Sequence, residues 1–148
     1  MNTERFKFRY VFVKDFGGKT GICYKMPIFN LDIITNENFS KIIQSYIDYN
    51  YKLISIEQAT GLKDKNGKPI YEGDIIKYLY YNPKRYTKWI VAFNPDTLEF
   101  GLHSYEYIGY QRLTSYSISN NKVEVIGNKF QNSRPYNNSI WSIASSTK

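Results

Sequence analysis

The chain has 148 residues, a length that fits one domain large enough to bury a core. Hydrophobic residues make up 42% and aromatic residues 18%, which excludes a disordered chain and favours a β-rich protein. The formal net charge of +7 favours a polyanionic or acidic partner, although positive charge also serves solubility.

The N-terminal segment alternates between aromatic and basic side chains, which predicts a half-buried strand over residues 5–13. The glycines at 17 and 18 predict a turn to a return strand over 20–25, so this region is expected to form a hairpin. The only cysteine, Cys23, falls in the return strand, where we interpret it as a small buried hydrophobe. The aromatic face holds Phe6, Phe8, Tyr10 and Phe12, and the basic face holds Arg5, Lys7 and Arg9.

One segment has helical periodicity. Apolar residues recur at spacings of three and four between residues 37 and 49, which predicts an amphipathic helix from Glu37 to Tyr49 that packs on the sheet. Thr35 or Asn36 can cap its start, and Asn50 can take the left-handed conformation at its end. The preceding residues 26–34 are expected to be irregular.

Short strands separated by turn residues follow the helix, a meander typical of a small barrel. Beyond residue 132 the composition shifts to Ser and Asn, which predicts a tail over 133–148 that is either mobile or held by Trp141. The strands are expected at 51–56, 75–81, 86–94, 98–105 and 122–128, with a shorter one ending at 117–118.

The densest structural information lies in the run TGLKDKNGKPIYEGDIIK, residues 60–77. Asn66-Gly67 suits a two-residue type I′ turn, in which both central residues have positive φ. Pro69 fits a strand start or edge, and the segment 72–74 forms a second turn before the strand that begins at Ile75.

These residues resemble a known family. Residues 60–76 match, almost letter for letter, the TGLKDKNGKEIYEGDIV-type sequence of the YopX-like proteins of phages and prophages of low-GC bacteria. Two further blocks are similar to that family, the basic-aromatic residues 7–9 and the EVIGN run at 124–128. The resemblance implies a phage or prophage origin and a β-rich fold with an SH3-like barrel, and it brings no assigned activity.

Composition, periodicity and resemblance together predict a mainly β (α+β) fold. An SH3-like barrel is expected over residues 56–132, with an N-terminal hairpin and helix subdomain over 1–55 packed on it. Because we find no run of 18 apolar residues and no leader segment, we expect a cytosolic protein, and the resemblance implies the cytoplasm of a bacterial host.

Residues suited to catalysis are scarce. His103 is the sole histidine, so any catalytic triad would depend on it, and its place on an expected strand favours a structural role. Glu72 and Asp74 form the best acidic pair, but turn chemistry explains them more simply than a metal site does. We therefore expect no catalysis, no metal and no cofactor.

The strongest candidate for a binding surface is the stretch 77–90, where basic and aromatic residues are interleaved and no acid occurs between Asp74 and Asp96. Lysine and arginine suit phosphates, and tyrosine and tryptophan faces stack bases. The alternative is that the aromatics face the core and the cations form an ordinary solvated edge. The candidate residues are Lys77, Lys84, Arg85, Tyr86, Lys88 and Trp89, joined by Arg5, Lys7 and Arg9 of the first strand.

These observations predict a phage accessory protein that acts by stoichiometric binding. Nucleic acid is slightly favoured as the partner because of the positive charge. The alternative is an inhibitor that binds and blocks a host or anti-phage defence protein, such as a CRISPR effector, through an exposed aromatic patch. The oligomeric state stays open.

Overall fold

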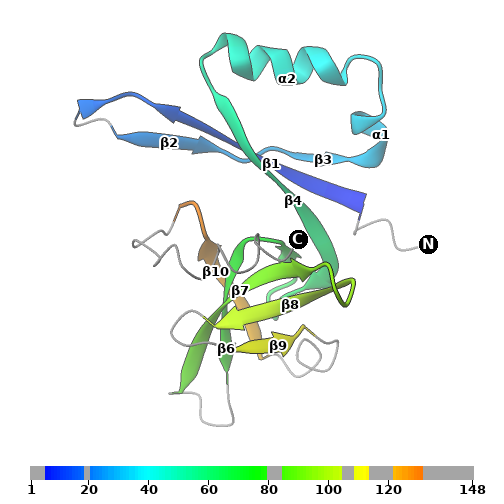
Figure 1. Cartoon of the computed structure of the whole chain (residues 1–148), viewed down its shortest axis with the longest axis vertical. Helices are drawn as coiled ribbons and strands as arrows, with labels where there is room; N and C mark the ends of the chain where they lie inside the picture. Colours follow the sequence, from blue (N-terminus) through cyan, green and yellow to red (C-terminus); the bar gives the residue numbers. More distant parts are fainter. Residues whose placement is uncertain (1–5, 19–20, 80–84, 105–108, 114–121, 132–148) are drawn as a thin grey trace.

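A computed structural model describes residues 6–18, 21–79, 85–104, 109–113 and 122–131. Within these ranges it confirms the predicted mainly β fold, with two five-stranded antiparallel sheets and two helices (Figure 1). One sheet has the order β2-β1-β4-β5 with β3 also paired to β1, and the other has the order β10-β6-β7-β8-β9. The N-terminal elements are β1 (Lys7–Asp15), β2 (Ile22–Lys25), β3 (Ile28–Asn30), α1 (Leu31–Ile34), α2 (Phe39–Asp48) and β4 (Lys52–Lys63). The remaining strands are β5 (Pro69–Tyr71), β6 (Asp74–Leu79), β7 (Tyr86–Asn94), β8 (Glu99–Ser104), β9 (Tyr110–Arg112) and β10 (Val123–Asn128).

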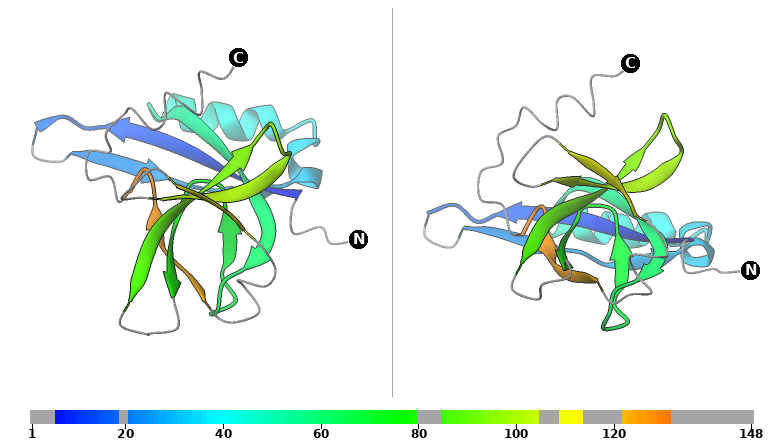
Figure 2. Two further views of the ribbon diagram at one scale, coloured as in Figure 1. Left: turned by 60° about the horizontal axis from the view of Figure 1, so that its bottom comes forward. Right: turned by 90° about the horizontal axis from the view of Figure 1, so that it is seen from below.

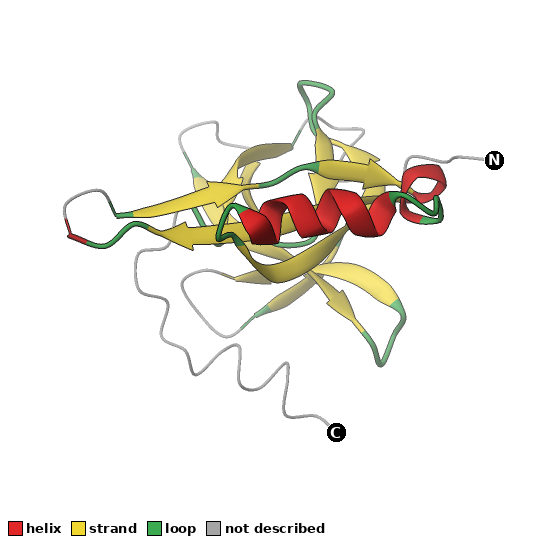
Figure 3. Ribbon diagram, turned by 90° about the horizontal axis from the view of Figure 1, so that it is seen from above, coloured by secondary structure: helices red, strands yellow, loops and turns green. Residues whose placement is uncertain are grey.

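The predicted N-terminal hairpin is present, with β1 and β2 antiparallel and Phe12 opposite Lys25. The aromatic face of β1 carries α2, which lies along the strands (Figure 3). Phe12 stacks on Tyr46 of the helix with ring centroids 4.2 Å apart, and Tyr10 meets Phe39 edge to face. The alternating pattern of the sequence therefore forms a small aromatic core between this sheet and the helix.

The helix α2 is shorter than predicted and ends as predicted. Asn50 has φ 61°, and the Asn50 and Tyr51 N–H groups donate to the Ile47 and Tyr46 carbonyls at 2.8 and 2.9 Å. This is a Schellman-type end, in which a left-handed residue lets the last carbonyls find donors. The prediction that residues 26–34 are irregular was wrong, because β3 and α1 form there.

The strand β4 connects the N-terminal hairpin to the barrel region. Its first part pairs with β1, and its second part pairs with β5 at Ala59 and Lys63. Figure 1 shows it passing from the N-terminal layer down to the level of the curled sheet, and Figure 2 shows that sheet from two further sides. The boundary predicted between residues 55 and 56 thus falls inside one continuous strand.

The turn at Asn66-Gly67 is not of the predicted type I′. Of the two residues only Gly67 has positive φ, and its N–H donates to the Asp64 carbonyl at 2.9 Å, as in a type I turn followed by a bulge. The Asp64 side chain accepts from the N–H groups of Asn66 and Lys68, which favours this geometry. Its second oxygen accepts from Val125 N–H at 3.0 Å and thereby joins the turn to β10.

The barrel core is apolar and buried, and it lies between β5, β6, β7, β8 and β10. The strand predicted at 86–94 is confirmed residue for residue as β7, whereas β9 was not predicted. The expected short strand at 117–118 and the tail at 133–148 lie outside the described residues. Among the described helices, none has the length and apolar character needed to cross a membrane. The core residues are Ile70, Ile76, Tyr78, Trp89, Val91, Leu102 and Val123.

Candidate nucleic-acid interface

Two lysines lie directly opposite each other on the outer face of the barrel. Lys77 of β6 pairs in register with Lys88 of β7, and no described carboxylate forms an ion pair with either. Like charges at a cross-strand position destabilise a sheet, so this pair is not explained by fold stability. The acidic neighbour Glu124 lies opposite Lys77 on β10, but its carboxylate binds Lys65 Nζ at 2.8 Å.

An exposed tyrosine borders this lysine pair. Tyr86 is 48% exposed, and the Lys77 ammonium lies 4.4 Å from the centroid of its ring. Alternation along β7 places Tyr86 and Lys88 on one face, and Arg85, which precedes the strand, is exposed. The structure thus brings together Lys77, Arg85, Tyr86 and Lys88, which we call the β6–β7 surface.

The structure corrects the expectation that Trp89 stacks on a partner. Trp89 is 4% exposed and packs in the barrel core, while its indole N–H donates to Thr87 Oγ1 at 2.6 Å. Successive side chains of a strand point to opposite faces of the sheet, so Trp89 points into the core while its neighbour Lys88 points outward. For this residue the sequence-based alternative, an aromatic that faces the core, is the one the structure shows.

Arg9 is also interior and does not reach the surface. Its guanidinium donates to Glu57 Oε2 and to Asp74 Oδ1, each at 2.7 Å. The residue is 9% exposed because the face of β1 opposite the helix packs against the barrel. Arg9 therefore has a structural role and not the partner-binding role that the sequence predicted.

The ion pairs of Arg9 belong to a larger buried network. The amide of Asn128 donates to Glu57 Oε2 at 3.2 Å, and the second oxygen of Asp74 accepts from Tyr71 N–H at 2.8 Å. Burial raises the pKa of the Glu57 and Asp74 carboxyls, and the charge of Arg9 opposes that rise. We call these four residues, Arg9, Glu57, Asp74 and Asn128, the buried polar cluster.

The three blocks that resemble the YopX-like proteins meet at this cluster. Arg9 comes from the first block, Asp74 from the second and Asn128 from the third. The cluster links β1, β4, β6 and β10, so it ties the N-terminal sheet to the barrel. The family-like residues thus account for the joint between the two sheets.

The other predicted site residues are dispersed. Lys7 lies on β1 in the N-terminal sheet, away from β6 and β7 in the strand order. Arg5 and Lys84 lie outside the described residues. The sequence reasoning missed Lys122, which directly precedes β10 and whose carbonyl accepts from Leu79 N–H at 2.7 Å at the end of β6. Only the pairing of β6 with β10 reveals that proximity.

A curled antiparallel sheet joined by a buried polar cluster to a helix-covered sheet defines a β-rich domain with a half-barrel. The chain belongs to the YopX family, since the family model described as YopX protein matches residues 21–135. No curated protein matches the sequence. One similar solved structure is the crystal structure of protein EF1440 from Enterococcus faecalis, with 22% identity over 86% of this chain and 72% of that chain and a TM-score of 0.35.

The sole histidine offers a test of the described barrel by pH. Partial burial lowers the pKa of His103 from its usual 6.5. The stability that this neutral ring contributes is therefore complete above the unfolded pKa of 6.5 and is lost as the pH falls through the lower folded value. We expect an NMR titration of the ring to give a midpoint below 6.5, and a midpoint at or above it would contradict the described environment.

Proposed function

We propose that the protein acts by stoichiometric binding to nucleic acid through the β6–β7 surface. The observation that carries this proposal is the cross-strand pair Lys77 and Lys88, two like charges with no described ion-pair partner beside an exposed tyrosine. Phosphates would relieve their mutual repulsion, and the exposed ring of Tyr86 suits a stacked base. The phage or prophage origin that the YopX-like proteins imply fits an accessory role of this kind.

The proposed role is not catalytic. His103 contacts the ring of Tyr110, and the two oxygens of Asp74 accept from Arg9 and from Tyr71 N–H, so neither His103 nor Asp74 is poised to attack a substrate. These contacts support a binding protein over an enzyme. Turnover of a nucleic acid that is abolished by His103→Ala in a folded variant would contradict this part of the proposal.

Replacing Lys77 and Lys88 together with glutamine tests the interface. We expect weaker binding to a labelled single-stranded oligonucleotide, because two phosphate contacts are lost. The slope of log affinity against log salt should become shallower by roughly 1.4, since each contact contributes about 0.7. Fluorescence anisotropy at several salt concentrations measures both changes.

The matched control replaces Lys41 and Lys63, two exposed lysines away from β6 and β7, and removes the same net charge. This control should retain the slope of the wild-type protein. If both double variants lose affinity equally, the effect is one of net charge and the assigned surface is wrong.

A second candidate function is supported by the N-terminal layer. Large apolar side chains are exposed there, including Phe16 at 50%, Ile22 at 58% and Ile28 at 50%. Exposed apolar surface is a feature of protein-binding sites. It favours the alternative in which the protein binds and blocks a host or defence protein.

A further inference from the structure

A second cationic-aromatic site lies at the other end of the molecule, beside α2. The alternation of β1 continues from Phe12 to Lys14, and the pairing with β2 sets Lys25 opposite Phe12. Both lysines therefore lie on the face that carries the helix. The sequence reasoning missed this site because it depends on the register of β1 with β2.

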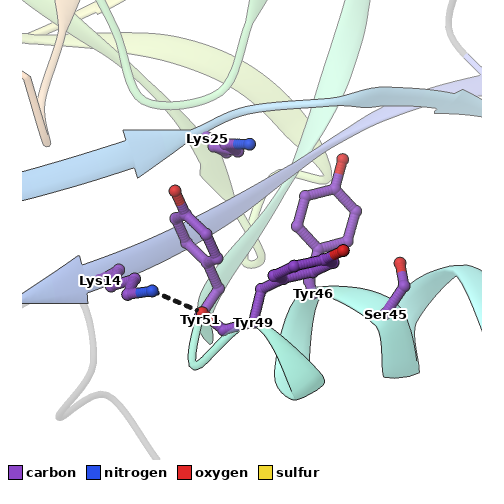
Figure 4. A pocket seen from close by; sticks show the side chains of 6 residues that line it. All are labelled: Lys14, Lys25, Ser45, Tyr46, Tyr49 and Tyr51. Carbon is purple, nitrogen blue, oxygen red and sulfur yellow. Dashed lines mark hydrogen bonds between the residues drawn. The ribbon is translucent and has the colours of Figure 1, made fainter.

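The two lysines line a pocket of about 390 Å³, a volume in the range of small-molecule sites. Figure 4 shows Lys14 and Lys25 on the strands facing tyrosines of the helix and of the segment that follows it. The lining contains no carboxylate. The lining residues are Lys14, Lys25, Ser45, Tyr46, Tyr49 and Tyr51.

The positive charge in this pocket is held in place and is not neutralised by the described residues. Lys14 Nζ donates to the Tyr49 carbonyl at 2.8 Å, which fixes the ammonium at the C-terminal end of α2. The Lys14 and Lys25 ammonium groups lie 5.6 and 5.3 Å from the centroid of the Tyr51 ring. Neither forms an ion pair with a described carboxylate. The pocket is therefore suited to an anion.

The three tyrosines of the lining differ in how far their side chains are available to a ligand. Tyr46 is stacked on Phe12, and the Tyr51 hydroxyl lies 3.8 Å from Cys23 Sγ, so both are engaged in the fold. Tyr49 is 72% exposed and forms part of the pocket lining (Figure 4). An exposed ring in the lining that also contains the two lysines can stack on a base while the cations bind the phosphate.

We propose that this pocket binds a nucleoside phosphate, supplied as a free nucleotide or as one unit of a single strand. Lys14 and Lys25 bind the phosphate, and Tyr49 stacks on the base. The pocket shares no residue with the β6–β7 surface and is formed by other strands and by α2. Binding in the pocket therefore does not depend on that surface. The two sites are therefore separable by mutation.

Titration of the protein with uridine monophosphate, inorganic phosphate and a single-stranded oligonucleotide, followed by NMR, tests the proposal. Replacing Lys14 and Lys25 together with glutamine should weaken nucleotide binding at least tenfold, and Tyr49→Ala should weaken it about tenfold through the lost stacking. Inorganic phosphate should bind more weakly than the nucleotide and should be indifferent to Tyr49→Ala. The double variant of Lys41 and Lys63, which removes the same charge outside both proposed sites, is the control and should bind the nucleotide like the wild-type protein.

The probes also distinguish the source of the ligand. Loss of mononucleotide binding in the pocket variant supports a free nucleotide, and loss confined to the oligonucleotide supports a strand. Unchanged binding of both probes in a pocket variant that melts like the wild-type protein would overturn the proposal. Equal binding of phosphate and nucleotide would overturn the role of Tyr49. If the Lys77 and Lys88 double variant binds nucleic acid like the wild-type protein, the proposed β6–β7 interface is wrong and the pocket proposal is unaffected.

Discussion

Replacing Arg9 with alanine is expected to lower the free energy of unfolding by about 3–5 kcal/mol. The substitution leaves the carboxylates of Glu57 and Asp74 buried without the cation that they both contact at 2.7 Å. Glu57 keeps only a long ion pair with Lys129 Nζ at 3.9 Å and a hydrogen bond from Asn128, which brings no charge. Because domains of this size are stable by about 5–15 kcal/mol, this loss is a large fraction of the total stability. Urea denaturation measures the change.

Arg112 provides the matched control for this prediction. It also forms an ion pair, with Glu99 at 3.1 Å, but its side chain is 69% exposed. Exposed pairs contribute about 0–1 kcal/mol, so Arg112→Ala should have a small effect. Similar losses for the two alanine variants would show that the buried polar cluster does not hold the two sheets together.

Replacing Gly73 with alanine is expected to be nearly as disruptive. Gly73 has φ +79°, and a Cβ at this position would collide with the Glu57 carboxylate. The backbone cannot easily move away, because Gly73 N–H donates to the Val91 carbonyl at 2.8 Å and its own carbonyl accepts from Lys129 N–H at 2.9 Å. Strain of about 1–2 kcal/mol from the left-handed backbone therefore adds to about 1–3 kcal/mol of overpacking.

Gly67→Ala separates these two contributions. Gly67 has the same φ of +79°, but no atom beyond its chain neighbours lies within 4 Å of the place that an alanine methyl group would take. Its substitution should cost only the backbone strain of about 1–2 kcal/mol. Thermal or urea unfolding of the two variants gives the difference, and equal losses would contradict the close packing of Gly73 against Glu57.

The sequence pattern predicted elements whose signals are local. The strand β7 and the end of α2 at Asn50 depend on alternation and on one left-handed residue, and both are present. The turn at Asn66-Gly67 differs from the predicted type because the Asp64 side chain accepts hydrogen bonds from the backbone N–H groups of Asn66 and Lys68. Local preference therefore gave the position of this turn and not its type.

The candidate site was harder to predict because its geometry is set by contacts distant in sequence. Alternation in β1 indicated that Arg9 faces away from the aromatic residues, but it could not reveal that the barrel covers this second face. The same limit applied to Trp89, where the choice between core and surface depends on strand position in the sheet. The pairing of Lys77 with Lys88 likewise required the register of β6 and β7.

The most direct test of the proposed nucleic-acid binding is an affinity pulldown from bacterial lysate, with and without nuclease, at low and high salt. The wild-type protein should retain nucleic acid that nuclease and high salt remove, and charge reversal of Lys77 and Lys88 to glutamate should abolish retention. The control charge reversal of Lys41 and Lys63 should leave retention unchanged. A protein partner that persists through nuclease and high salt, and that remains bound to the Lys77→Glu, Lys88→Glu variant, would contradict the account and support the inhibitor alternative.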